Sequence, residues 1–494
     1  MNKQKRYMAL DFGTSNGVAM AGAFDGKKLE LETMRRFEVA ATSMLGTTYW
    51  DFPSMLINAK RGLSAFVASH GSDLAGVACD SWGVDFGLLD KTGHLLANPV
   101  HHLDMRTEGA MAKFHAMIPG RSLYQLTGVV PRRQVTLYQL YSMVQANNQL
   151  LDKAVTMLLM ADLVSYFLSG TPVQEYTLAT TTSMYDVDSL DWSRDTILTA
   201  KIPPVIVPEI VAPGTVIGPM LDSVAAECGL GQVPIIAPAS HAMAGALAAT
   251  PAEGDDWLYL VSGDWNQVGV EAATPLINDA TFAAGFTTEG GVDGSFRLFK
   301  GLNGLSILEA CLGVWTNEDR KEPDVGAIIE LAEAAEPMAR LINPDDLRLE
   351  GVADMPRALN QLLAESGQPA AETRSDLVRL CLDSLVMSHR HAVLQLMELT
   401  ARKYSVIHVV GWGAGVPVLN QALADATGIP VKAGPMEAKS IGNIIMQAMA
   451  LGDVASLEEA REVVRNSFET TFHEPGQDTA KWDDAYGRYL KMIR

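Results

Sequence analysis

The chain has 494 residues, 48% of them hydrophobic, and a formal net charge of −20 at pH 7. This length exceeds what a single hydrophobic core organises, so at least two domains are expected. The acidic balance argues against nucleic acid or an anionic membrane surface as a partner. No apolar run reaches the roughly 18 residues of a membrane-spanning helix, and no signal peptide precedes the first predicted strand. A cytoplasmic protein is therefore expected.

The cysteines give no sign of a metal site or a disulfide framework. All four are isolated in the sequence, and none forms a Cys-x-x-Cys pair. Buried thiols in a reducing compartment are the expectation, because free cysteine behaves as a small hydrophobic residue. Dimers are common among soluble enzymes, so a homodimer is the default expectation for the assembly.

The first hundred residues begin with three strands. Alternating apolar residues predict strands over Tyr7–Asp11, Val18–Phe24 and Leu29–Arg35. An amphipathic helix is predicted over Pro53–Ser69, and another strand over Leu74–Asp80. Hairpins and a strand–helix–strand pattern together favour a mixed sheet.

The turn between the first two strands is a candidate phosphate site. Asp11 ends an apolar strand, and Gly13, Thr14 and Ser15 follow it with backbone N–H and hydroxyl donors. Such a combination can place phosphates and a metal ion side by side. An ordinary hairpin turn can have the same residues, so the motif alone does not distinguish a phosphate site from a simple turn.

The segment after the fourth strand is rich in chemistry. Trp82 offers a flat apolar face, Gly83 allows close approach, and Asp85 offers a fixed acceptor; Asp104 and Arg106 follow. Stacked apolar faces beside fixed hydrogen-bonding groups suit a polyhydroxylated ligand. A turn with a strand-end cap is the structural alternative for the same residues.

The middle of the chain carries a second candidate site. A helix is predicted over Asp162–Leu168, and the Ser/Thr-rich stretch Thr177–Ser183 resembles a loop. A buried strand over Val233–Pro238 then leads into a small-residue helix that begins near His241. A ligand at this junction would face the unpaired N–H groups of the helix N-terminus.

A second hairpin, Leu258–Ser262 with Gln267–Glu271, echoes the first about 250 residues later, which suggests a duplicated protein. Its turn contains Gly263 and Asp264. Further on, the strand Ser405–Val410 runs into a loop with Gly411 and Gly413. A strand, a glycine loop and a helix form a phosphate-binding site in many α/β folds. The same arrangement is also an ordinary connection between a strand and a helix.

The other predicted elements of the second half are mostly helical. Ser440 is expected to cap a helix that runs to Leu451, and the tail from Ser456 is expected to be helical and polar. The strand and the other helices are predicted over Phe296–Lys300, Leu302–Trp315, Asp324–Ala334, Met355–Glu365, Asp376–Thr400 and Val418–Thr427. The pattern predicts an α/β fold with mixed sheets. The predicted division is 1–232, 233–455 and a helical tail over 456–494.

Several of these segments together resemble the FGGY family of carbohydrate kinases, and within it the rhamnulokinase group. The resemblance covers about Tyr7 to Leu451 in the family's order. It is carried by the segments ALDFGTS at 9–15, DSWGVDF at 80–86, YTLATTT at 176–182, ASH at 239–241, LNQALAD at 419–425 and AGPMEA at 433–438.

The resemblance implies two actin-like (ribonuclease H-like) domains, each a mixed sheet flanked by helices, with a cleft between them. It implies ATP and Mg²⁺ as cofactors and a ketose as substrate. The metal ion would be held through waters near Asp11, and the phosphates would meet the residues of the two hairpin turns and the glycine loop. The sugar would contact Trp82, Gly83, Asp85, Asp104, Arg106 and His241.

The chain departs from the family pattern on the catalytic side. The family's general base, an Asp after the His, is Ala242 here, and an alanine accepts no proton. Asp264 stands where the family offers a Thr to the phosphates, Trp412 replaces a glycine of the adenosine loop, and Val18 and Val416 replace an Arg and an Asn. A carboxylate beside a triphosphate repels it unless a metal ion lies between them.

Two readings follow from the resemblance and its departures. In the first, the chain is a kinase that phosphorylates a rhamnulose-like ketose with ATP. In the second, the fold is retained while the protein binds a sugar or sugar phosphate without transferring phosphate, or performs different chemistry. The residues alone leave both open.

Overall fold

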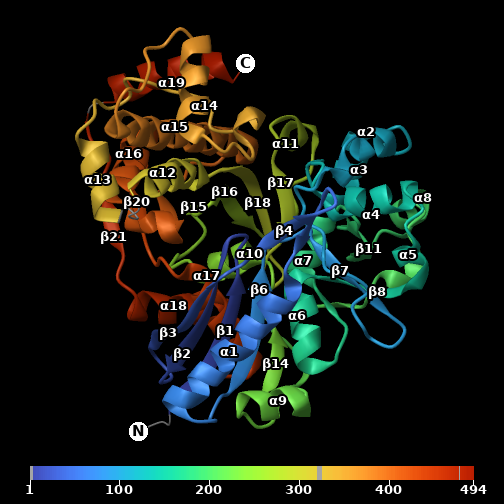
Figure 1. The fold of residues 1–494 in the computed structure, drawn as a ribbon. Helices are drawn as coiled ribbons and strands as arrows, with labels where there is room; N and C mark the ends of the chain where they lie inside the picture. Colours follow the sequence, from blue (N-terminus) through green and yellow to red (C-terminus); the bar gives the residue numbers. More distant parts are fainter. Residues whose placement is uncertain (1–3, 320–324, 478, 494) are drawn as a thin grey trace. The chain divides into compact units, whose positions relative to one another are not determined.

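A computed structural model describes residues 4–319, 325–477 and 479–493 (Figure 1). The chain divides into two compact units of interleaved segments. The first unit is Met1–Pro251, Glu271–Leu298 and Ala438–Ser467, and the second is Ala252–Val270, Phe299–Glu437 and Phe468–Arg494. The strand and the helix that follow residue 232 pack into the first unit.

The first unit is built on a six-stranded mixed sheet. Its order is β13-β14-β6-β1-β2-β3, with β14, β6 and β1 parallel and β1, β2 and β3 antiparallel. The strands are β1 (Lys5–Phe12), β2 (Asn16–Phe24), β3 (Leu29–Glu38), β6 (Gly76–Ser81), β13 (Thr215–Pro219) and β14 (Pro234–Ala237). The strand β6 is buried throughout and β1 is buried from Tyr7 onward, as expected for a sheet covered on both faces.

Helices cover the two faces of this sheet. On one face, α1 (Phe52–His70) packs closely because Gly62 lets its backbone approach Ala19 of β2. On the other face, α17 (Ala438–Ala450) packs against β1 and β6, and Ile444 contacts Gly22. The helix α10 (Ala242–Ala248), which follows β14, packs against α17. The sheet and these helices hold the ends of β1, β6 and β14 in place.

The second sheet repeats the pattern of the first. Its order is β17-β18-β16-β15-β19-β20-β21, in which β15 pairs antiparallel with β16 and parallel with β19. In the first sheet, β1 likewise pairs antiparallel with β2 and parallel with β6. The strands are β15 (Trp257–Val261), β16 (Trp265–Ala272), β17 (Thr287–Gly290), β18 (Phe296–Asn303), β19 (Val406–Val410), β20 (Val431–Ala433) and β21 (Thr471–His473). The two related hairpins are the ones that the sequence pattern predicted.

The remaining elements complete the two units. The other strands are β4 (Ala41–Met44), β5 (Thr47–Trp50), β7 (Phe86–Asp90), β8 (Ala154–Leu159), β9 (Gln174–Glu175), β10 (Tyr185–Asp186), β11 (Asp191–Trp192) and β12 (Ile210–Val211). The other helices are α2 (Ala110–His115), α3 (Gly120–Thr127), α4 (Thr136–Gln145), α5 (Gln149–Lys153), α6 (Met160–Ser169), α7 (Tyr176–Ala179), α8 (Arg194–Thr199), α9 (Asp222–Cys228), α11 (Asp279–Ala283), α12 (Ser306–Asp319), α13 (Val325–Glu333), α14 (Met355–Glu365), α15 (Arg374–Thr400), α16 (Pro417–Thr427), α18 (Leu457–Ser467) and α19 (Ala480–Met492). The short 3₁₀ helices are η1 (Met105–Thr107), η2 (Thr180–Thr182), η3 (Pro204–Ile206), η4 (Leu347–Leu349) and η5 (Trp412–Gly415).

Three local predictions were wrong. The Ser/Thr-rich stretch is helical and buried, because Glu175 caps α7 and the threonine hydroxyls donate to carbonyl groups three residues earlier. Ser440 lies inside α17, which begins at Ala438, and so does not cap it. The tail contains a strand, β21, which pairs with β20. The predicted helix Asp324–Ala334 begins at a residue outside the described part of the chain.

The prediction of buried free thiols is confirmed. The four cysteines, Cys79, Cys228, Cys311 and Cys381, are free thiols and are buried. Among the residues that the structure describes, no helix is long and apolar enough to cross a membrane. The fold class, α/β with mixed sheets flanked by helices, is also as predicted.

Candidate functional site

Three neighbouring parallel strands of the first sheet, β1, β6 and β14, lead to predicted site residues: Asp11 lies near the end of β1, and Trp82 and His241 follow β6 and β14. Asp11 near the end of β1 lies opposite Asp80 of β6 in the register. Ser81, at the end of β6, forms a parallel β-bridge with His241, and its N–H donates to the Ser240 carbonyl group at 2.9 Å. The carboxyl ends of parallel strands are the usual place for ligands in α/β sheets.

Asp11 and Asp80 form a carboxyl pair. Asp80 is 1% exposed, and Asn443 donates to its Oδ2 at 2.5 Å, while its Oδ1 has no donor among the residues that the structure describes. Burial, together with the charge and the hydrogen bond of Asp11, raises the pKa of Asp80 well above its usual value. Two facing carboxyl groups require a shared proton or a nearby cation. This donor set fits a magnesium ion near Asp11, although the described residues contain no group of three or more potential ligands for a metal ion.

Asp85 is the centre of a buried hydrogen-bond network. Its Oδ2 accepts from the indole N–H groups of Trp50 at 2.8 Å and Trp82 at 2.9 Å, and His102 Nδ1 lies 2.8 Å away. Its Oδ1 accepts from the side-chain amide of Gln139 at 3.1 Å. Asp85 is fully buried, so its acceptor capacity is used within the protein. These contacts favour a role in positioning the neighbouring segment rather than in direct contact with a sugar.

The charge of Asp85 is stabilised in place. Burial alone would raise its pKa, but the charge and hydrogen bond of His102 and the two indole donors lower it below its usual value. The preceding residue, Val84, has a φ of 71°, which is rare for a β-branched residue. Its carbonyl group accepts from Thr136 Oγ1 at 2.8 Å. Such strain persists only where the surroundings over-determine the backbone, and it is concentrated at functional sites.

Asp104 and Arg106 lie beside this network. Asp104 accepts from the backbone N–H groups of Thr48 and Arg106, both at 2.8 Å, and so caps η1 and holds it to β5. Arg106 donates to Gln139 Oε1 at 2.6 Å. Gln139 therefore connects Arg106 to Asp85, and Arg106 supports the segment at 82–86 through this amide.

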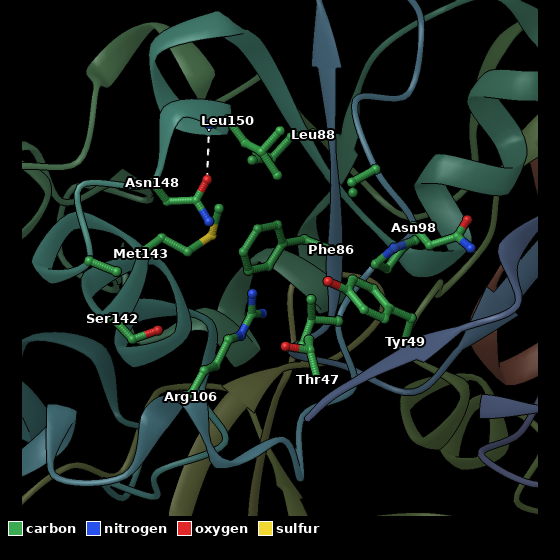
Figure 2. Close-up of a pocket in the computed structure, with 15 residues that line it drawn as sticks. Thr47, Tyr49, Phe86, Leu88, Asn98, Arg106, Ser142, Met143, Asn148 and Leu150 are labelled. Carbon is green, nitrogen blue, oxygen red and sulfur yellow. Dashed lines mark hydrogen bonds between the residues drawn. The ribbon is translucent and has the colours of Figure 1, made fainter. Parts of the chain in front are cut away.

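A cavity of about 380 Å³ lies beside Arg106 in the first unit, and Figure 2 shows the residues that line it. The guanidinium group of Arg106 points toward Phe86, and its centre lies 5.8 Å from that ring. Its Nε atom is buried and has no hydrogen-bond partner in the part of the chain that the structure describes. The cavity is lined by Thr47, Tyr49, Phe86, Gly87, Leu88, Ala97, Asn98, Pro99, Val100, Arg106, Ser142, Met143, Ala146, Asn148 and Leu150. Of the predicted sugar residues, only Arg106 lines it.

The junction of β14 and α10 is anchored by a buried acid. Glu175 Oε2 accepts from the N–H of Ser240 at 3.1 Å and from Thr177 Oγ1 at 2.5 Å. Thr177 Oγ1 accepts in turn from the N–H of His241 at 3.0 Å. Burial raises the pKa of Glu175 to about 7. Ala242, the first residue of α10, is 5% exposed, so a carboxylate at this position would lie at a helix N-terminus.

Two residues that the sequence analysis missed hold the His241 ring. Arg297 donates to His241 Nδ1 at 3.0 Å and to Glu289 Oε2 at 2.8 Å. Its Nε donates to the carbonyl group of Gly290 at 3.0 Å. Arg297 lies 56 residues after His241 in the sequence. No local motif signals this pairing, because the strands β17 and β18 bring it about.

In the second unit, Asp264 of the turn at Gly263 and Asp264 interacts with a second acid, Glu309 of α12. The N–H of Gly263 donates to Asn266 Oδ1 at 3.0 Å, and its carbonyl group accepts from Leu305 at the start of α12. Burial and the charge of Asp264 raise the pKa of Glu309, on α12, to about 7. The sequence analysis identified only one of these two acids. Together they make this turn a poor place for a phosphate group unless a cation accompanies it.

The glycine loop forms η5 and closes tightly on the hairpin. A Cβ at Gly413 would lie 2.1 Å from Ser262 Oγ, and Gly411 has a φ of 87°, so both positions require glycine. The N–H of Gly413 donates to the carbonyl group of Ser262 at 3.2 Å. Trp412 is partly buried against the helical core of the second unit. The loop is therefore rigid, and the indole occupies space within it.

The predicted phosphate turn of the first hairpin is also ordered. The N–H of Gly13 donates to the carbonyl group of Asn16 at 2.8 Å, and the carbonyl group of Ser15 accepts from Val39 at 2.8 Å. Thr14 is partly exposed in this turn. The turn therefore has a fixed backbone and leaves the Thr14 side chain accessible.

Comparison with known proteins agrees with this arrangement over the full length of the chain. The FGGY family of carbohydrate kinases, N-terminal domain, matches residues 6–248, and its C-terminal domain matches residues 258–451. A rhamnulokinase from Bacteroides thetaiotaomicron is 35% identical over 491 residues, covering 99% of this chain and 100% of that protein.

Solved structures show the same fold. A gluconate kinase from Lactobacillus acidophilus superposes with a TM-score of 0.81 at 15% identity, covering 99% of this chain and 98% of that one. A glycerol kinase from Plasmodium falciparum with ADP superposes with a TM-score of 0.79 at 15% identity, with the same coverage. The two-domain actin-like fold is therefore confirmed. The chain belongs to the FGGY family of carbohydrate kinases.

Proposed function

We propose that the protein transfers the γ-phosphoryl group of ATP, with Mg²⁺, to a hydroxyl group of a rhamnulose-like ketose. The observation that carries this proposal is the full-length similarity to a rhamnulokinase, at 35% identity. The ordered ends of β1, β6 and β14 support it, because a sugar kinase needs fixed groups at such an edge. We propose the cytoplasm, where ATP is available, as the site of action, and a homodimer as the assembly.

The roles follow the geometry of each unit. Asp11 would hold the hydrated magnesium ion, whose charge would offset that of the phosphates. The turn from Gly13 to Ser15, and in the second unit Gly263 and the loop with Gly411 and Gly413, would contact the nucleotide. Trp82, Gly83 and His241 would contact the sugar. Asp85, Asp104 and Arg106 would position this sugar-binding segment, since each of them makes side-chain hydrogen bonds within the protein.

Because residue 242 has no carboxylate, we expect phosphoryl transfer by this protein to be slow. Phosphoryl transfer passes through a loose transition state, so positioning and electrostatics supply most of the catalysis. A positioned general base contributes about 10²- to 10⁴-fold in addition. The protein is therefore expected to be a slow kinase whose sugar specificity is retained.

The test is phosphorylation of a panel of ketoses in the presence of ATP and Mg²⁺, followed by mass spectrometry of the sugars. We expect one ketose, with L-rhamnulose the first choice, to gain a single phosphoryl group slowly. Gluconate and glycerol are suitable controls, because related folds act on them. Binding of a ketose without formation of any sugar phosphate over a long incubation would overturn the proposal.

A further inference from the structure

The hydrogen bond between Arg297 and His241 determines which nitrogen of the imidazole carries a proton. A guanidinium group only donates hydrogen bonds. Arg297 lies 3.0 Å from His241 Nδ1, so this nitrogen must accept. Glu289 Oε2 is farther from the same nitrogen, at 3.4 Å, and lies 2.8 Å from Arg297. The ion pair of Arg297 and Glu289 therefore satisfies the carboxylate and leaves Nδ1 without a proton.

The surroundings of the ring favour its neutral form. Burial lowers the pKa of His241, and the positive charges of Arg297 and Lys439 lower it further. Glu289 acts in the opposite direction, but the net shift is downward. A neutral imidazole with an unprotonated Nδ1 carries its proton on Nε2. The hydrogen bonds of His241 involve its Nδ1, which accepts from Arg297, and its backbone N–H, which donates to Thr177. Its Nε2 therefore has no partner among the described residues.

We propose that Arg297 and Glu289 are positioning residues that hold His241 as a neutral imidazole, with its Nε2–H available as a donor to an oxygen atom of the bound sugar. The proposal rests on the sugar-binding role of His241 in the proposed function. Glu289 neutralises Arg297, which is fully buried, so that the guanidinium group can stay beside the ring.

This arrangement has a consequence for the missing general base. A base must accept a proton, but Nε2 already carries one and Nδ1 faces a guanidinium group. His241 therefore does not replace the carboxylate that Ala242 lacks. An Nε2–H donor does suit the keto oxygen of an open-chain ketose, because that oxygen only accepts hydrogen bonds.

The direct test is ¹⁵N NMR of the full chain with labelled histidine, with His241 assigned by comparison with His241→Asn. The two neutral tautomers and the cation differ in the shifts of their ring nitrogens. We expect the Nε2–H tautomer alone from pH 6 to 8. An Nδ1–H tautomer or a cation at pH 7 would overturn the proposal, whether or not the protein proves to be a kinase.

The double variant Arg297→Met/Glu289→Met tests the role of the pair. It removes both charges together, so no buried charge is left without a partner. Both tautomers should then be populated at high pH, while acid should restore a protonated Nε2. At pH 8 the KM for the sugar should rise about 2- to 10-fold, which corresponds to the free energy of one hydrogen bond. The KM should fall again as the pH decreases, and kcat should change little. A KM independent of pH, or a loss confined to kcat, would contradict the proposal.

Two further variants keep this test specific. Arg461→Met/Glu271→Met removes a second ion pair of the first unit, whose atoms lie 2.9 Å apart and whose side chains are mostly buried. It should leave both the His241 tautomer and the KM unchanged. Glu289→Gln should retain the Nε2–H tautomer, because Arg297 still donates to Nδ1. If Glu289→Gln instead moves the proton to Nδ1, the carboxylate and not Arg297 determines the tautomer, and the proposal fails.

Discussion

His102 Nδ1 lies 2.8 Å from Asp85 Oδ2, the same oxygen atom that accepts the indole N–H groups of Trp50 and Trp82. One buried carboxylate thus holds two tryptophan rings, whose centroids lie 4.4 Å apart, and a histidine. The Asp85 carboxylate therefore fixes the orientation of the tryptophan rings, including that of Trp82, which is proposed to contact the sugar. Loss of that charge would release the whole segment.

We expect Asp85→Asn to destabilise the protein by more than about 1.5–3 kcal/mol at pH 7, the value of a single hydrogen bond to a charged group, because several such bonds converge on this carboxylate. The amide also adds two donors where five donor groups already converge. Urea unfolding measures the change in free energy, and Asp188→Asn, at an exposed turn, is a matched control. A change within about 0.5 kcal/mol, the range of surface substitutions, would show that Asp85 does not organise this segment.

The same pair makes a prediction about pH. The pKa of Asp85 is lowered in the folded state from its usual 3.8, so its contribution to stability is present above that value and is lost in acid. The difference in unfolding free energy between the wild type and Asp85→Asn should therefore shrink as the pH falls from about 4 toward 2. A difference that stays constant over this range would contradict the assignment.

Much of the fold follows from apolar periodicity. The hairpins β1–β2 and β15–β16, and the strands β6, β14 and β19, are continuous buried runs bounded by turn residues, which is why the sequence predicts them. The helices α7 and η2 escaped prediction, because their threonines use their hydroxyl groups within the helix instead of in a loop. The strand β21 depends on a partner, β20, far away in the sequence.

The site shows the same limit. Its motifs name Asp11, Trp82 and His241, because these residues lie at the ends of strands beside turns. They do not reveal that Asp85 is surrounded by five donor groups or that Arg297 holds the His241 ring. Such contacts arise from tertiary packing, and residue type and spacing carry no signal for them.

Gly83→Ala tests how tightly the sugar-binding segment is held. A Cβ at this position would lie 2.9 Å from Thr181 Oγ1 and 3.0 Å from its Cγ2, so the segment must shift. We expect a higher KM for the sugar. Thr181→Ala removes both of these contacts, so the double variant should recover part of the loss. If the single substitution leaves the KM unchanged, Gly83 does not lie against the sugar.

Glu309→Gln tests the acid pair of the second unit. Because the pKa of Glu309 is raised from 4.5 to about 7 in the folded state, the unfolding free energy should fall as the pH rises from about 4.5 to 7. The substitution should remove this fall and tighten ATP binding at pH 8, where two carboxylates otherwise repel the phosphates. Glu330→Gln, on another helix of the second unit, is the control. Equal ATP affinity for wild type and Glu309→Gln at pH 8 would place the phosphates elsewhere.

Trp412→Gly tests whether the indole occupies the space of an adenine ring. The substitution restores the glycine that the family has at this position, and we expect a lower Kd for ATP with little effect on the Kd for the sugar. Titration calorimetry measures both constants. A weaker affinity for ATP would instead mean that the indole stacks on the adenine, as an aromatic face can.

The most direct test of the account is the rate of ketose phosphorylation by Ala242→Asp and Ala242→Asn, compared with that of the wild type. The account predicts slow transfer by the wild type, a rise of about 10²- to 10⁴-fold in kcat for the aspartate, and no rise for the asparagine, which has the same shape but accepts no proton. All three proteins should bind the ketose alike. If Ala242→Asp binds both the ketose and ATP yet is no faster than Ala242→Asn, a proton acceptor at this position does not limit the reaction, and the account is contradicted.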